Sequence, residues 1–60
     1  MMRFIVNKTF EGVDYEIPVS LEERYIFLTT KIAYAKQENY DELYRGYTIV
    51  LENEFGKYRV

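Results

Sequence analysis

The sequence predicts an α+β domain with the element order ββα(α)ββ, in which a four-stranded antiparallel sheet is covered on one face by one long helix. Three observations lead to this fold. Alternating hydrophobicity flanks Glu11-Gly12, a continuous helical pattern spans residues 20–38, and alternation returns after Gly46. Sixty residues make a single domain, 1–60. Numbered in chain order, the strands are placed as 2-1-3-4.

The first two strands form a hairpin around Glu11-Gly12. Large apolar residues alternate with polar ones on both sides of this dipeptide. A two-residue turn, to which Gly12 is suited because glycine tolerates positive φ, pairs Phe10 with Val13 and collects the apolar side chains except Ile5 on one face. A slip of one residue would turn that face to solvent. Pro18 has no N–H to donate, so the second strand is expected to be an edge strand or to end there.

A helix is expected from Ser20 to about Glu38, because Ser20 and Glu23 have the spacing of a capping box. We expect a break at Asn39 and then one short helical turn that Gly46 stops. The face that seats the helix on the core follows the i, i+4, i+7 pattern and comprises Leu21, Tyr25, Leu28, Ile32 and Ala35.

The chain after Gly46 is expected to supply the third and fourth strands, over 47–52 and 57–60. A four-residue loop between them would set Glu52 opposite Lys57. Such a cross-strand pair contributes about 0.2–1 kcal/mol. The long helix would return the chain so that the third strand lies antiparallel to the first.

The long helix has a second apolar face, which a domain of this size has little material to cover. Three coverings stay open: a second copy of the chain, a foreign partner, or the segment 40–45 folding back as internal core. A homodimer is favoured, because a twofold pair is the commonest closed arrangement and adds burial that a small domain needs. The residues of this predicted interface are Ile26, Phe27, Thr30, Ala33, Tyr34 and Gln37.

Reactive side chains are scarce. The chain has no histidine and no cysteine, which excludes disulfides and removes the usual zinc ligands. Ser20 is assigned to a helix cap, and the paired acids Glu22/Glu23 and Asp41/Glu42 to helix starts, where acids are stabilised. We therefore expect no catalytic residue, no metal and no cofactor, and an orphan enzyme is the least favoured alternative.

The charge pattern argues against a strongly electrostatic nucleic-acid binder, because the net charge is −2 and the two signs are interspersed. A dimeric nucleic-acid-binding regulator remains the alternative function. The outer face of the predicted sheet also mixes both signs and is either a docking face or simply solvated. Its charged residues are Arg3, Glu16, Glu52, Lys57 and Arg59.

No apolar run approaches the roughly 20 residues of a membrane span, and the apolar stretch near the N-terminus is too short for a signal-peptide core. We therefore expect a soluble cytoplasmic protein. The function that these patterns favour is a small non-enzymatic protein–protein interaction module, acting as an adaptor, inhibitor or regulator, and forming a homodimer through the second face of the long helix.

Overall fold

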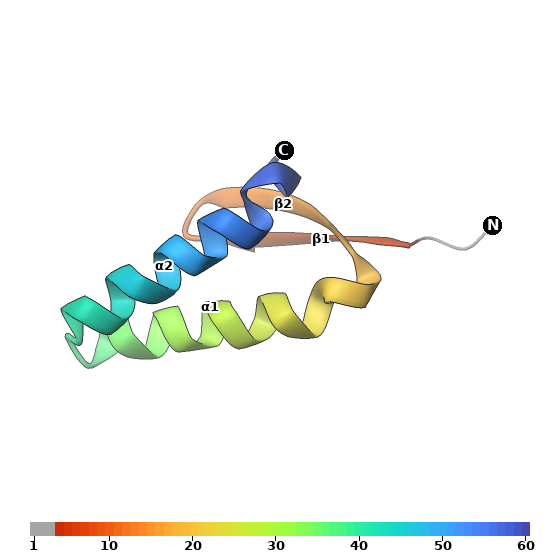
Figure 1. Ribbon diagram of the computed structural model, residues 1–60. Helices are drawn as coiled ribbons and strands as arrows, with labels where there is room; N and C mark the ends of the chain where they lie inside the picture. Colours follow the sequence, from red (N-terminus) through yellow and green to blue (C-terminus); the bar gives the residue numbers. More distant parts are fainter. Residues whose placement is uncertain (1–3) are drawn as a thin grey trace.

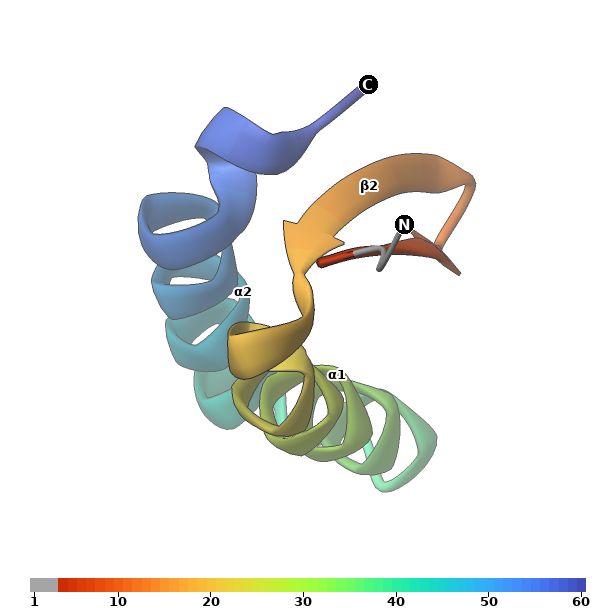
Figure 2. The same ribbon diagram turned by 90° about the vertical axis from the view of Figure 1, so that its right-hand side faces the viewer.

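The computed structural model describes residues 4–60, which form a two-stranded hairpin followed by two helices (Figure 1). The two helices run antiparallel side by side, and the hairpin lies along one side of them, as the end-on view in Figure 2 shows. The molecule is elongated, 43 × 17 × 17 Å, and the connection between the helices extends beyond the hairpin turn (Figure 1). The elements are β1 (Ile5–Phe10), β2 (Val13–Pro18), the 3₁₀ turn η1 (Val19–Leu21), α1 (Glu22–Gln37), α2 (Asp41–Phe55) and the 3₁₀ turn η2 (Gly56–Tyr58).

The predicted hairpin and its register are confirmed. β1 and β2 pair antiparallel, with Phe10 opposite Val13 and Val6 opposite Ile17. Both turn residues have positive φ, 50° at Glu11 and 79° at Gly12, as a tight two-residue turn of this hand requires. The alternation of apolar side chains and the turn chemistry therefore agree on one register.

The outer edge of β2 is partly covered by the end of the chain. Arg59 forms an isolated antiparallel bridge with Tyr15, and the N–H of Val60 donates to the carbonyl of Asp14 at 3.0 Å. The predicted fourth strand over 57–60 is wrong, because the chain makes a 3₁₀ turn before this bridge.

The predicted long helix is confirmed as α1, but its start differs from the prediction. Ser20 lies in η1, the helix begins at Glu22, and no side-chain hydrogen bond caps it, so the predicted capping box is wrong. The helix ends at Gln37. The break expected at Asn39 is confirmed, because this residue has a φ of 61° in the left-handed region that ends helices.

The predicted four-stranded sheet with a single long helix is wrong. Residues 41–55 form a second full helix, which takes in Gly46 and the whole predicted third strand. In that strand Ile49 and Leu51 would have pointed to the same side. In α2, Ile49 is 52% exposed and Leu51 only 3%, as expected for residues on opposite sides of a helix.

A helical period was present in the same segment. Tyr44, Thr48, Leu51 and Phe55 recur at i, i+4, i+7 and i+11, and all four lie on the covered side of α2. This period, and not the alternation of residues 47–52, decides the structure, because it lets α2 bury one face against both α1 and β2.

The core lies between the hairpin and the two helices, and Tyr25 is at its centre. The ring of Tyr25 meets that of Tyr15 from β2 and that of Phe55 from α2, each with 5.4 Å between ring centroids and in edge-to-face geometry. Such aromatic pairs contribute about 0.5–1.5 kcal/mol beyond their burial. The fully buried residues are Tyr15, Ile17, Tyr25, Leu28, Ile32, Ala35, Leu51 and Phe55.

Ion pairs tie the elements together at the rim of this core. Lys8 of β1 contacts Glu22 of α1 at 2.7 Å. Arg24 of α1 donates two hydrogen bonds to the carboxylate of Glu54 on α2, at 2.9 and 2.7 Å. The guanidinium fork matches the carboxylate, which fixes the antiparallel alignment of the helices at this end.

Replacement of Tyr25 by Phe should flatten the alkaline loss of stability. Burial raises the pKa of Tyr25 to about 12, and its hydroxyl has no hydrogen-bond partner among residues 4–60. Since the folded-state pKa lies above the ordinary value of 10.0, the neutral form favours folding below pH 10, and this contribution is lost as the pH rises toward 12. Urea unfolding from pH 7 upward should therefore show a shallower decline above pH 10 for Tyr25→Phe, with stability at pH 7 at least equal to wild type.

Tyr34→Phe is the matched control for this experiment, because Tyr34 is exposed. An equal change of slope in both variants would contradict the assignment to Tyr25.

Replacement of Gly46 by Ala should stabilise the chain. Gly46 lies inside α2, and a Cβ at this position meets nothing within 4 Å. The expected gain is about 0.5–1 kcal/mol, because alanine favours the helix interior. Chemical denaturation measures it, with Gly12→Ala as the control of opposite sign, since a φ of 79° strains any side chain. A destabilised Gly46→Ala would mean that the fold itself needs this glycine.

Candidate functional site

The side of α1 that faces away from the core is apolar and open to solvent. Ile26 is 47% exposed, Phe27 45% and Tyr34 54%, although they lie in the middle of the helix. The segment 40–45 does not fold back over them, because it continues into α2. We call this surface the α1 face, and it comprises the six residues singled out in the sequence, Ile26, Phe27, Thr30, Ala33, Tyr34 and Gln37, all of them exposed.

Two cations frame Phe27 on the α1 face. The guanidinium carbon of Arg24 lies 5.8 Å from the centre of the Phe27 ring, and the ammonium nitrogen of Lys31 lies 5.5 Å from it. Glu54 holds Arg24 through its side-chain hydrogen bond, which lowers the pKa of the Glu54 carboxyl and raises that of Arg24. Arg24 is therefore held in place by Glu54, whereas Lys31 forms no ion pair within residues 4–60.

The α1 face continues onto the connection between the helices. The rings of Tyr34 and Tyr40 lie 6.0 Å apart in edge-to-face geometry. Tyr40 in turn borders a shallow depression of about 370 Å³ together with Asp41, Glu42 and Leu43. Aromatic surface thus extends without a gap from α1 to the start of α2.

A second exposed apolar surface lies on α2. Glu42, Leu43, Gly46, Tyr47 and Val50 line an open depression of about 290 Å³. We call this surface the α2 groove. This surface was not predicted, because residues 47–52 were assigned to a strand. The residues at 43, 46, 47 and 50 nevertheless have the i, i+3, i+4, i+7 spacing of one side of a helix.

The charged residues of the predicted outer sheet face lie on different elements. Glu16 is on β2, Glu52 on α2, Lys57 in η2 and Arg59 at the bridge to β2. The predicted cross-strand pair of Glu52 and Lys57 is therefore wrong, because neither residue lies in a strand. Arg3 lies outside the described residues.

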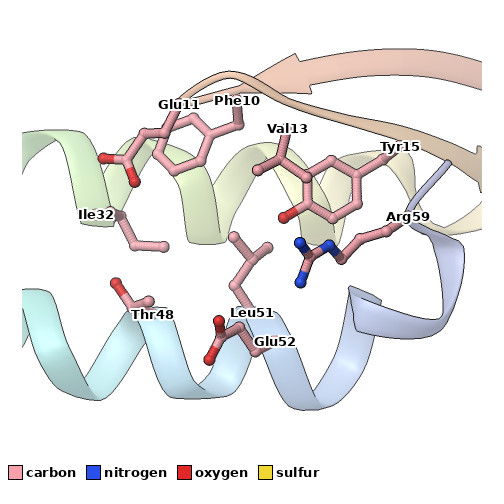
Figure 3. Close-up of a pocket in the computed structure, with 9 residues that line it drawn as sticks. All are labelled: Phe10, Glu11, Val13, Tyr15, Ile32, Thr48, Leu51, Glu52 and Arg59. Carbon is pink, nitrogen blue, oxygen red and sulfur yellow. The ribbon is translucent and has the colours of Figure 1, made fainter.

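Glu52 and Arg59 instead border a hollow between the hairpin and α2 (Figure 3). Its volume is about 130 Å³, below the roughly 300–1,000 Å³ of small-molecule sites. The hollow is therefore too small for a typical cofactor and has room for a few water molecules. It is lined by Phe10, Glu11, Val13, Tyr15, Ile32, Thr48, Leu51, Glu52 and Arg59.

Glu11, one of the polar residues that line this hollow, has structural partners. Both carboxylate oxygens of Glu11 lie 3.3 Å from the hydroxyl of Tyr44, which donates to them, and one lies 3.8 Å from the ammonium of Lys36. Burial raises the pKa of Tyr15, and the charge of Arg59 opposes part of this rise. The contacts of Glu11 fasten the hairpin turn to the two helices.

Other site types gain no support from residues 4–60. No three residues of the types that bind metals converge there. In the same part of the chain, neither helix has the length and apolarity that crossing a membrane requires. The exposed apolar surfaces of the helices are thus the features from which a function can be argued.

Comparisons of the chain with protein-family models, with curated proteins and with solved structures found no match.

Proposed function

We propose that this chain is a small protein-interaction module that pairs with a second copy of itself through the α1 face. The observation that carries the proposal is the exposure of Ile26, Phe27 and Tyr34 in the middle of a well-packed helix. Exposed apolar side chains gathered on one surface are typical of interaction sites. A domain of 60 residues also gains more from association than a larger one, because its own core is small.

A second copy fits this face because the face is complementary to itself. In an antiparallel pair with a twofold axis near Lys31, residues equally far from the axis meet. Phe27 of one copy then lies within one residue of the level of Tyr34 of the other, and Thr30 within one residue of the level of Ala33. Small side chains at the centre allow close approach, and aromatic rings fill the space on both sides of it.

The charges at the border of the α1 face support the same arrangement. The twofold axis near Lys31 also sets Arg24 of one copy level with Glu38 of the other. Opposite charges therefore meet at both ends of the contact. Lys31 lies near the axis, where the ammonium groups of the two copies approach each other and weaken the pair.

The expected dimer is weak. α1 has 16 residues and is therefore about 24 Å long. One face of such a helix is smaller than the roughly 800 Å² per partner of a standard interface. We therefore expect a dissociation constant in the micromolar range.

The double variant Phe27→Asp/Tyr34→Asp should be monomeric. Sedimentation from about 1 to about 500 µM should show a dimer for wild type, and the double substitution should weaken the dimer on the order of 100-fold, because both aromatic rings of each copy are lost from the contact. The fold should persist by circular dichroism, since both side chains are exposed in the single chain.

The matched control is Ile49→Asp, which changes an exposed residue of α2 outside the α1 face. It should keep the dimer. A wild-type chain that stays monomeric over this range, or a control that dissociates as readily as the double variant, would rule out self-association through α1.

Two charge variants test the antiparallel alignment. Lys31→Gln removes the like-charge approach at the axis and should tighten the dimer. Glu38→Lys sets a cation opposite Arg24 and should loosen it. Each effect should be about 1.5- to 5-fold, the range of exposed ion pairs, and should shrink as salt is added. Changes of the same sign in both variants would contradict this alignment.

A further inference from the structure

The α2 groove has a feature that the fold does not explain. Gly46 lies inside α2, where glycine is unfavourable, and a Cβ there meets nothing within 4 Å. Gly46 has a helical conformation, so this position does not need glycine in order to adopt a positive φ. Because Gly46 has no side chain, there is a notch between Leu43 and Val50, and the backbone of another molecule can approach closely there.

The walls of this notch are apolar. Leu43 is 51% exposed, and Tyr47 and Val50 are half-buried, so their outer surfaces remain available. These residues follow the axis of α2 in a stripe about two helical turns long. A stripe of this spacing with a small residue at its centre matches the ridge of another helix, whose axis can then lie near the short end of the usual 8–10 Å separation, at about 8 Å.

The end of the groove near the connection between the helices is acidic. Asp41 and Glu42 border the depression beside Leu43, are exposed, and take part in no ion pair within residues 4–60. Asp41 and Glu42 also suit the start of α2. The groove is therefore complementary to a segment that combines apolar and basic side chains.

We propose that the α2 groove binds an amphipathic basic helix of another protein. Asp41 and Glu42 at one end favour a basic partner, and the notch at Gly46 favours a helix that crosses it closely. A second copy of this chain does not offer such a helix. Arg45 is the one basic residue of α2, and the border of α1 mixes Arg24 and Lys31 with Glu38.

This inference does not depend on the dimer, because the residues of the groove are separate from those of the α1 face. The two surfaces are linked by the contact between Tyr34 and Tyr40 at one end and by the Arg24–Glu54 ion pair at the other. The monomeric variant Phe27→Asp/Tyr34→Asp should therefore bind the partner helix as wild type does, which separates a failure of the dimer from a failure of the groove.

The experiment titrates the isotope-labelled chain with a synthetic helical peptide of about 18 residues, in which leucines follow the i, i+3, i+4, i+7 pattern and the other positions are lysine. A peptide with glutamate in place of lysine is the control. We expect amide shift changes centred on residues 40–50, micromolar affinity for the lysine peptide that falls with added salt, and at least tenfold weaker binding of the glutamate peptide.

Gly46→Ala is the decisive variant, because its Cβ fills the notch without disturbing the fold. It should weaken binding of the lysine peptide at least fivefold. Asn53→Ala, which changes an exposed residue further along α2, should leave the affinity for this peptide unchanged. Equal affinity of Gly46→Ala and wild type, equal binding of both peptides, or shift changes confined to the α1 face would overturn the proposal. So would a loss of the dimer in Gly46→Ala, which would assign the groove to a second copy.

Discussion

The edge-to-face contact of Tyr25 with Tyr15 and Phe55 is the interaction on which the rest of the fold depends. It joins β2, α1 and α2 at one point. An isolated two-stranded hairpin is marginal in water, and helices of about 15 residues are marginal as well. The hairpin and the helical pair therefore need each other, and the ring of Tyr25 is where the face of α1 meets both.

The same arrangement determines which surfaces stay open. Two strands about 4.8 Å apart make a narrower layer than two helices about 10 Å apart. The hairpin therefore covers the side of the helices that carries Leu28 and Leu51, and leaves the side that carries Phe27 and Leu43 to solvent. The α1 face and the α2 groove are open because, within residues 4–60, no element covers that side of the helices (Figure 2). The connection between the helices, which extends beyond the hairpin turn, enlarges the open area (Figure 1).

The sequence was informative where two independent signals agreed. In the hairpin, the alternation of side chains and the Glu11-Gly12 turn require the same register. In α1, the helical period and the break at Asn39 define the same element. The exposed residues of the α1 face could be identified from the sequence for the same reason, since a helix that buries Tyr25 and Ile32 must turn Phe27 away from the core.

The second half of the chain was predicted wrongly because its signals conflict. Residues 47–52 alternate like a strand, while Leu51 and Phe55 continue a helical period that starts before Gly46. Glycine ends many helices but is also tolerated within them, so this residue alone does not distinguish the two. Packing decides the outcome, because only a helix brings Thr48 and Leu51 to the covered side together, whereas residues three apart lie on opposite faces of a strand. The α2 groove could not be found from the sequence while this segment was assigned to strands.

The bridge between Tyr15 and Arg59 has a consequence for the order in which the structure forms. The two hairpins, one of strands and one of helices, are each built from neighbouring segments, and such local contacts form quickly. The bridge instead joins the first third of the chain to its end, so it closes a long loop and is expected to form last. Its release in a partial opening would bare the edge of β2 while both hairpins stay intact, and would free the amide of Val60, which donates to Asp14, to exchange its hydrogen.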